Sequence, residues 1–253
     1  MEKNLVWISG GSTGIGKATA KKFIYEGWNV AVTARNLEEL KKLKSEIENT
    51  NNINKLYIFQ CDIKDIEQVK NIVKKIEEIG PINLTILNAG TTHPYTEEFN
   101  INYYNHVVET NISGTLNCIS SIYPFYKKRR EGHLSIVSSM VGYRGLPTAS
   151  AYTMTKAALI NLAESLYFDF RKIGVRVSLI NPGFIQTRLT DKNNFPMPFL
   201  KSSDYAANII YKGLMNKKKF EIIFPLPWFI IMKLARLLPY KIYFYLVSKI
   251  TKL

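Results

Sequence analysis

The stretch that decides the fold is GGSTGIGKA at residues 10–18, which directly follows the apolar run LVWIS at residues 5–9. Read from Gly11, it nearly matches the phosphate-binding loop of nucleoside triphosphatases, but Ala18 stands where that loop needs a Ser or Thr hydroxyl to hold Mg²⁺. Read from Gly10, it matches a dinucleotide loop, whose glycines allow a tight turn, close approach to pyrophosphate and close helix–strand packing. The phosphates would lie on amides of the first helix turn, among Gly10, Ser12, Thr13, Gly14, Ile15 and Gly16. The loop by itself favours a dinucleotide and leaves the triphosphate alternative open.

Size and composition indicate one globular α/β domain. The chain has 253 residues, of which 46% are hydrophobic and 12% aromatic, unlike a disordered sequence. Cys61 and Cys118 lie far apart in sequence without a C-x-x-C motif, which favours buried free thiols in a cytoplasmic protein over a disulfide or a zinc site. The sequence shows no secretory signal and no run of about 18 apolar residues, so we expect no spanning helix.

Strand-like apolar runs alternate with segments of helical periodicity along the whole chain. The expected strands are residues 5–9, 29–34, 55–60, 83–87, 134–138, 176–180 and 221–224, and the expected helices are 14–26, 37–49, 65–79, a region around Asn111 up to 130, and 151–173. Several of these strands are apolar nearly throughout, as parallel strands buried on both faces are. The alternation predicts a doubly wound parallel sheet of about seven strands with helices on both faces, forming a single domain of residues 1–253. Its ligand cleft should lie at the carboxyl ends of the strands.

The end of the second expected strand bears on the choice of cofactor. Proteins that bind NAD usually place an acid there for the ribose hydroxyl. VAVTARN at residues 30–36 instead ends in Arg35 and Asn36. A guanidinium can pair bidentately with a 2′-phosphate, so this end predicts NADP(H) in preference to NAD(H). The alternative is that Arg35 is an ordinary surface arginine.

Three residues point to carbonyl chemistry. LSIVSS at residues 134–139 ends with Ser139, and AYTMTKAA at residues 151–158 opens a helix that carries Tyr152 and Lys156 on one face. Lys156, with the positive nicotinamide of an oxidised cofactor, is expected to lower the pKa of the Tyr152 phenol from its usual value of about 10. Tyr152 would then serve as a general acid and base. A Y-x-x-x-K pair alone is common, and it gains weight from Ser139 upstream.

With the glycine loop, this serine and this Tyr/Lys pair in one order, the chain resembles the classical short-chain dehydrogenase/reductase family over residues 5–225. SGGSTGIG at residues 9–16 is similar to the family's T-G-x-x-x-G-I-G, with Ser9 in place of threonine. The resemblance implies a Rossmann-type fold. It also implies cofactor contacts from Asp62 and Ile63 at the adenine, from Asn88, Ala89 and Gly90 in LNAG, and from Pro182, Gly183, Ile185 and Thr187 in NPGFIQT.

The resemblance further implies the catalytic roles. Ser139 and Tyr152 would hydrogen-bond the substrate carbonyl oxygen, and Tyr152 would donate its proton as hydride reaches the carbonyl carbon. Lys156 would hold the ribose hydroxyls and bias Tyr152. Asn111, in TNISGT, matches an asparagine that distorts a long helix and holds a water in a proton relay. The predicted catalytic set is therefore Asn111, Ser139, Tyr152 and Lys156.

The residues around this set suggest an apolar substrate. The segment 186–216 is expected to fold over the nicotinamide side as a lid. The predicted pocket residues are Met140, Tyr143, Leu146 and Met154 on one wall, with Phe195 and Met197 from the lid. The alternative is that these side chains are only core and lid packing. The three histidines share no ligand spacing, so no metal site is predicted.

The C-terminal tail, residues 225–253, carries much of the net charge of +14. From Lys217 onward there are eight Lys or Arg residues against one acid, Glu221, which gives +7. Helical spacing places Trp228, Ile231, Leu234, Ala235 and Leu238 on one face, and a second amphipathic piece follows Pro239. Such basic, aromatic-rich helices can bind a membrane surface. The alternatives are packing over the active-site mouth or a contact in a homodimer or tetramer, which the family resemblance implies.

Together these observations predict an NADP(H)-dependent cytoplasmic oxidoreductase that interconverts an apolar ketone or aldehyde and its alcohol, with association at a membrane surface as the alternative location. The competing interpretation is a catalytically idle NADP(H)-binding scaffold or redox sensor, which usually has a damaged Ser–Tyr–Lys set. The positive charge also raises a nucleic-acid-binding role, but the sequence carries no recognisable binding motif, so no nucleic-acid partner is predicted.

Overall fold

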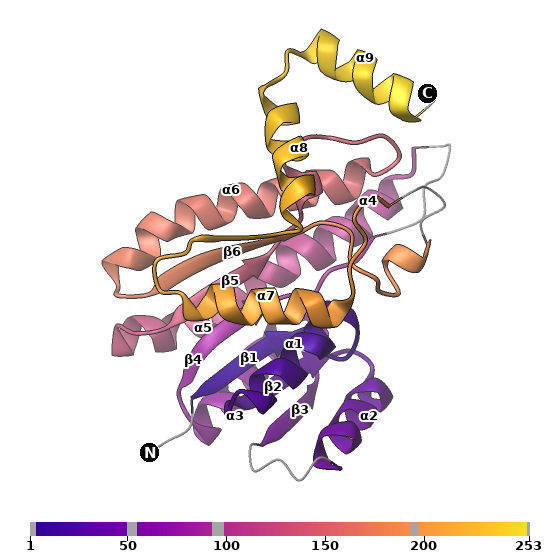
Figure 1. Ribbon diagram of the computed structural model, residues 1–253. Coiled ribbons are helices and arrows are strands. Elements are labelled where there is room, and N and C mark those ends of the chain that lie inside the picture. Colours follow the sequence, from indigo (N-terminus) through magenta and orange to yellow (C-terminus); the bar gives the residue numbers. More distant parts are fainter. Residues whose placement is uncertain (1–3, 50–54, 93–98, 193–196, 252–253) are drawn as a thin grey trace.

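The computed structural model describes residues 4–49, 55–92, 99–192 and 197–251, and its centre is a seven-stranded sheet (Figure 1). The strands lie in the order β3-β2-β1-β4-β5-β6-β7, and all neighbours run parallel. Their bounds are β1 Leu5–Ser9, β2 Asn29–Ala34, β3 Leu56–Gln60, β4 Ile82–Leu87, β5 His133–Val137, β6 Arg176–Pro182 and β7 Glu221–Phe224. The predicted doubly wound sheet is therefore confirmed, and β6 runs on to Pro182 instead of ending at residue 180.

Helices cover both faces of this sheet. The α-helices of the described residues are α1 Gly14–Tyr25, α2 Leu37–Glu48, α3 Ile66–Ile79, α4 Ile101–Val108, α5 Gly114–Arg129, α6 Ser150–Lys172, α7 Ser203–Met215, α8 Leu226–Leu237 and α9 Tyr240–Thr251. Asn36 and Asp65 begin α2 and α3 as N-caps, because their side-chain oxygens accept main-chain N–H groups of the first turn. The helix expected around Asn111 begins earlier, at Ile101, and continues through a π-helical turn, Glu109–Ser113, into α5.

Two apolar cores result, one on each face of the sheet. Alternate strand residues point to opposite faces, so Trp7 belongs to one core and its neighbours Val6 and Ile8 to the other. The first core takes its helical side chains from α3, α5 and α6, and the second from α1, α2 and α7. With both faces covered, the sheet is held rigid and its carboxyl edge is left to carry the site.

The C-terminal helices lie beyond the end of the sheet. α8 follows β7, and Figure 1 shows α9 standing off the body of the protein at the far end of α8. Met232 is buried, with Trp228 and Phe229 partly buried against the first core. The expected apolar face therefore divides, because Trp228 packs inward whereas Ile231 and Leu234 are exposed. Spacing showed which residues share a side of the helix but not which side meets the protein.

Candidate active site

The glycine loop packs tightly against the chain that follows β4. Gly10 has a φ of +65°, which an L side chain rarely adopts, and a Cβ there would lie 2.6 Å from the Ala89 Cα. A Cβ at Gly16 would collide with the Gly10 carbonyl oxygen and come within 2.5 Å of Asn88 Nδ2. Side chains at these positions would clash with the loop itself and with the segment that follows β4. Only glycine fits at these two positions without a clash, as expected for a loop that binds a pyrophosphate.

Hydrogen bonds hold this loop to the next strand end. Asn88 Nδ2 donates to the carbonyl oxygens of Gly10 at 2.8 Å and Ser9 at 3.3 Å. The Ser9 hydroxyl in turn accepts the N–H groups of Asn88 and Ala89. The hydroxyl at position 9 therefore fixes the LNAG segment beside the glycine loop, which explains why serine can stand in place of threonine there.

The first turn of α1 begins directly behind the loop. Thr13 is the N-cap, and its side chain makes no capping hydrogen bond. Main-chain N–H groups at a helix start have no partner within the helix and favour an anion. Ser12, Thr13, Gly14 and Ile15 all line the cleft at this point. The arrangement fits the phosphates of a dinucleotide.

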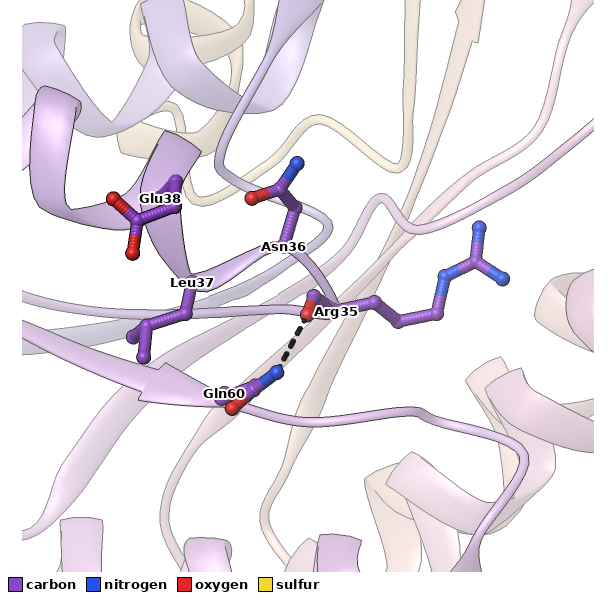
Figure 2. Close-up of a pocket in the computed structure, with 5 residues that line it drawn as sticks. All are labelled: Arg35, Asn36, Leu37, Glu38 and Gln60. Atoms are coloured by element: carbon purple, nitrogen blue, oxygen red, sulfur yellow. Dashed lines mark hydrogen bonds between the residues drawn. The ribbon is translucent and has the colours of Figure 1, made fainter.

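Arg35 lies at the edge of this cleft, beside an open depression (Figure 2). Its main chain is fixed, because Gln60 Nε2 donates to the Arg35 carbonyl oxygen at 3.0 Å. Its side chain is exposed and extends away from Glu38 in Figure 2. Among the described residues no ion pair involves Arg35. A guanidinium placed in this way is available to a phosphate.

Asn111 lies in the π-helical turn and joins two segments of the site. Its Oδ1 accepts the Thr91 N–H at 2.8 Å, and its Nδ2 donates to the Thr91 carbonyl oxygen and to Thr155 Oγ1, both at 3.0 Å. Thr155 stands between Tyr152 and Lys156 on α6. π-helical turns within α-helices often mark functional sites, and this one aims the amide of Asn111 at the predicted catalytic helix.

Ser139, Tyr152 and Lys156 meet at the other end of the cleft. Ser139 follows β5, and its hydroxyl donates to the Pro182 carbonyl oxygen at 3.2 Å and hydrogen-bonds the Tyr152 hydroxyl. Lys156 Nζ donates to the Val137 carbonyl oxygen at 3.0 Å and lies 5.5 Å from the centre of the Tyr152 ring. Both β5 and α6 are thus required to bring the three side chains together, as the sequence predicted.

Burial controls the titration of this pair. It raises the pKa of Tyr152 from 10.0 to about 12, opposed by the hydrogen bond from Ser139. It lowers the pKa of Lys156 from 10.5 to about 8. The prediction that Lys156 lowers the pKa of Tyr152 is therefore wrong for the protein without its cofactor, because desolvation disfavours the charged form of both side chains. The contribution expected from an oxidised nicotinamide belongs to the bound state.

A continuous cleft of about 390 Å³ connects the two ends. The predicted residues that line it are Gly10, Ser12, Thr13, Gly14, Ile15, Arg35, Asn36, Asp62, Ile63, Asn88, Ala89, Gly90, Ser139, Tyr152, Lys156, Pro182, Gly183, Ile185 and Thr187. Gly16 and Asn111 stand behind the lining, where Gly16 packs on Gly10 and Asn111 holds Thr91. The cleft runs along the carboxyl edge of the sheet, as expected for a doubly wound fold.

The predicted substrate-pocket residues that the structure describes do not border this cleft. Met140 and Tyr143 are buried, Leu146 is half-buried, Met197 is partly exposed, Met154 is exposed on α6, and Phe195 lies outside the described residues. The Tyr143 hydroxyl donates to Glu221 and accepts from Asn181 Nδ2 at 2.9 Å, with the Phe229 ring of α8 beside it. A role for these residues in holding substrate stays a prediction.

The first part of the segment after β6 lies beside the cleft, which Thr187, Arg188, Leu189 and Thr190 line. Arg188 Nη2 donates to Glu39 Oε1 on α2 at 2.9 Å, and the Arg188 guanidinium lowers the pKa of that carboxyl. The later part, α7, buries Ala206 and Ile210 in the second core instead. Sequence reasoning missed Glu39 and the pairing of Arg188, because a contact between residues 149 positions apart leaves no local signal.

The part of the chain that the structure describes contains neither a metal-binding cluster nor a membrane-spanning helix. Within it, no group of three or more His, Cys, Asp or Glu side chains could hold a metal ion. None of its helices combines the length and apolar character needed to cross a bilayer. Cys61 and Cys118 are free and buried, and burial raises the pKa of each thiol.

Comparisons with known proteins point to one family. A family model described as short chain dehydrogenase matches residues 4–197. An uncharacterized oxidoreductase of Myxococcus xanthus (strain DK1622) is 31% identical over 236 residues, which cover 92% of this chain and 91% of that protein. A 3-oxoacyl-(acyl-carrier-protein) reductase of Staphylococcus aureus (strain Mu50) is 30% identical over 186 residues, covering 73% and 75% of the two chains. The solved structure of ElxO with NADP bound has a TM-score of 0.76 at 28% identity and covers 88% of this chain and 98% of that one.

Proposed function

The chain belongs to the short-chain dehydrogenase family, and from this premise we propose that it is an NADP(H)-dependent oxidoreductase that interconverts an apolar ketone or aldehyde and its alcohol. The observation that carries the proposal is the meeting of Ser139, Tyr152 and Lys156 at one end of a cleft whose other end is the glycine loop. A dinucleotide in this cleft would present its nicotinamide to the tyrosine. The bound cofactor supplies the hydride.

The protein's own part is to bind the carbonyl and move a proton. In the direction of reduction, the Tyr152 hydroxyl donates its proton to the carbonyl oxygen, which the Ser139 hydroxyl orients through a second hydrogen bond. Because the pKa of Tyr152 is raised to about 12, the phenol is fully protonated at neutral pH and ready to donate. Lys156 remains mostly charged at neutral pH, so its ammonium can hold ribose hydroxyls and favour the tyrosinate left after proton transfer.

Asn111 has a supporting role in this proposal. It connects Thr91, after the LNAG segment, to Thr155 on the catalytic helix. A Cβ at Gly90 would lie 3.4 Å from Asn111 Oδ1 and 3.5 Å from Lys156 Nζ, so the amide and the ammonium lie close to one another. This position suits a residue that holds a water in a proton relay from Lys156 towards solvent.

The preference for NADP(H) rests on Arg35. Its exposed guanidinium borders the cleft, and no described acidic side chain pairs with it. The structure of ElxO, the relative described above, holds NADP, which supports the same cofactor here. Asn36 is occupied as the N-cap of α2 through its side-chain oxygen, so only its amide nitrogen is available to a phosphate.

The nature of the substrate, the assembly and the location are also proposals. The Staphylococcus aureus relative is named for a 3-oxoacyl group, which supports a ketone on an apolar chain. The family resemblance supports a homodimer or tetramer. The two buried free thiols support the reducing cytoplasm as the place of function.

A titration of the purified protein with NADPH and with NADH, followed by tryptophan fluorescence, tests the cofactor directly. Tighter binding of NADPH supports the proposal and justifies a screen of apolar carbonyls by NADPH consumption. Tighter binding of NADH would mean that Arg35 is an ordinary surface residue with no role in the choice of cofactor. Binding of neither would favour the idle scaffold, the competing function.

A further inference from the structure

The C-terminal arm, α8 and α9 with their connection (residues 226–251), exposes an unusual amount of apolar surface. Of the 21 large hydrophobic side chains that are exposed among the described residues, 11 lie on this arm. They are Leu226, Ile230, Ile231, Leu234, Leu237, Tyr240, Ile242, Phe244, Tyr245, Leu246 and Ile250. Contiguous exposed apolar surface on a protein marks an interaction site or a membrane contact.

These side chains form ordered stripes. Leu226, Ile230 and Leu234 follow one another at intervals of four residues and are 59%, 48% and 59% exposed, whereas Met232 on the other side of α8 is 3% exposed. α8 is therefore apolar on two sides and packs with only one of them. On α9 the same spacing aligns Ile242, Leu246 and Ile250, all exposed, and only Tyr243 is buried.

The charges of the arm have a single sign. Its basic residues are Lys233, Arg236, Lys241 and Lys249, and residues 226–251 contain no Asp or Glu. Lys233 pairs with Glu221 at 3.4 Å, whereas Arg236, Lys241 and Lys249 are exposed, and no ion pair of the described residues involves them. Exposed apolar stripes and unpaired cations together complement a surface in which a negatively charged outer layer covers an apolar interior.

We propose that this arm docks on the surface of an anionic lipid bilayer. The apolar stripes would enter the boundary between headgroups and acyl chains, the aromatic rings would lie at headgroup level, and the three unpaired cations would contact anionic headgroups. A second copy of the chain is the other candidate occupant. Two facing arms would bring six unpaired cations together with no acid from either arm, so the charge favours the bilayer.

The arm is fixed to the loop that lies between two catalytic residues. The Arg144 guanidinium lies 4.5 Å and 4.4 Å from the ring centres of Tyr240 and Tyr243, and it donates to the Leu238 carbonyl oxygen at 3.2 Å. The Tyr243 hydroxyl donates to the Gly145 carbonyl oxygen at 2.5 Å. Arg144 and Gly145 belong to the stretch between Ser139 and Tyr152. Docking of the arm would therefore hold the cleft in a set position relative to the bilayer.

Co-sedimentation of the full chain with phosphatidylcholine vesicles, with and without 30% phosphatidylglycerol, tests the proposal. We expect binding to the anionic vesicles and much weaker binding to the neutral ones, with the difference reduced in 0.5 M salt. The double variant Lys241→Gln/Lys249→Gln should bind anionic vesicles about 30-fold more weakly, because each cation near such a surface contributes about 1 kcal/mol. The matched control is Lys74→Gln/Lys75→Gln on α3, which removes the same charge from exposed positions outside the arm.

The apolar contribution is tested with Leu234→Glu, and its control is Phe168→Glu, an exposed aromatic on α6. Leu234→Glu should lower vesicle binding at least tenfold, with unchanged thermal unfolding, whereas Phe168→Glu should leave binding unaltered. The proposal fails if the wild-type chain stays in solution with anionic vesicles, or if the controls lose as much binding as the arm variants. A dimer that dissociates with Leu234→Glu, without any vesicle binding, would assign the surface to a second copy and overturn it too.

Discussion

The ammonium group of Lys156 lies 5.5 Å from the centre of the Tyr152 ring, with Lys156 buried and Tyr152 half-buried at the cleft. Burial disfavours the charged form of each side chain. It therefore raises the pKa of the Tyr152 phenol and lowers the pKa of the Lys156 ammonium. Burying these two groups lowers the free energy of unfolding, and the same two groups carry the proton transfer of the proposed reaction. The effect on stability and the effect on turnover can be measured separately.

Lys156→Met should stabilise the protein without cofactor. The pKa of Lys156 is about 8 in the folded protein and 10.5 as the ordinary value, so the unfolded chain binds more protons between these pH values. Folding stability from this group therefore rises as pH increases from 8 to 10.5. The gain from Lys156→Met in the free energy of unfolding should be about 3 kcal/mol at neutral pH and should vanish above that window. Urea unfolding at several pH values measures it.

Lys172→Met is the control for that series, because Lys172 is exposed at the end of α6 and its substitution removes no buried charge. A Lys156→Met protein that is less stable than wild type at every pH would mean that the hydrogen bond to Val137 outweighs the cost of burial.

Tyr152→Phe should remove turnover and leave cofactor affinity nearly unchanged. Loss of a positioned general acid typically costs about 10²–10⁴-fold in rate, whereas the ring still fills its place. Steady-state rates and an NADPH titration distinguish the two effects. Tyr167→Phe, on the same helix but outside the cleft, should behave as wild type. Lost NADPH binding in Tyr152→Phe would instead show a structural role.

Arg35→Ala should weaken NADPH binding and leave NADH binding unchanged. A hydrogen bond between charged groups contributes about 1.5–3 kcal/mol, which corresponds to roughly 10–150-fold in the dissociation constant. Fluorescence titrations with both nucleotides give the ratio. The matched control is Arg171→Ala, because Arg171 is also exposed but lies on α6, away from the cleft. Equal losses for both nucleotides would place Arg35 away from the 2′-phosphate.

Gly16→Ala should destabilise the fold and abolish cofactor binding. The added Cβ would collide with the Gly10 carbonyl oxygen and the Asn88 side chain, and such overpacking typically costs about 1–3 kcal/mol. Gly80→Ala is the control, since a Cβ at Gly80 meets nothing within 4 Å and its φ of 166° is extended backbone. Thermal unfolding with and without NADPH compares the two variants. An unchanged midpoint for Gly16→Ala would refute the close packing.

The sheet could be predicted from sequence because its signals are local. Apolar runs such as LVWIS mark strands wherever both faces are buried, and β1, β2 and β7 have the predicted bounds. The motif residues could be placed at the cleft for the same reason, since they follow strands whose carboxyl ends share one edge. The strand predicted over residues 134–138 begins one residue earlier, at His133, where burial lowers the pKa of the imidazole to about 3.

Contacts between distant segments could not be predicted. Asn111 was assigned from its motif, but its bonds to Thr91 and Thr155 come from three segments that meet only in the folded chain. The pKa of Tyr152 was expected to fall because of Lys156 and the positive nicotinamide of an oxidised cofactor. In the protein without its cofactor, burial, which sequence does not show, raises it instead. On α8 the spacing of apolar residues predicted an amphipathic helix. Which of its sides packs against the protein depends on contacts with Tyr143 and the first core, which spacing does not show.

The ion pair between Arg188 and Glu39 ties the segment after β6 to α2 beside the predicted nucleotide site. Arg188 follows β6 and Glu39 lies on α2 behind β2, so the pair bridges segments that three intervening strands, β1, β4 and β5, separate along the sheet. Both residues border the cleft. If a nucleotide bound in the cleft is held by this bridge, we expect its residence time to shorten as salt weakens the attraction between the two side chains. If release limits turnover, the rate would then rise with ionic strength, although no catalytic group has changed.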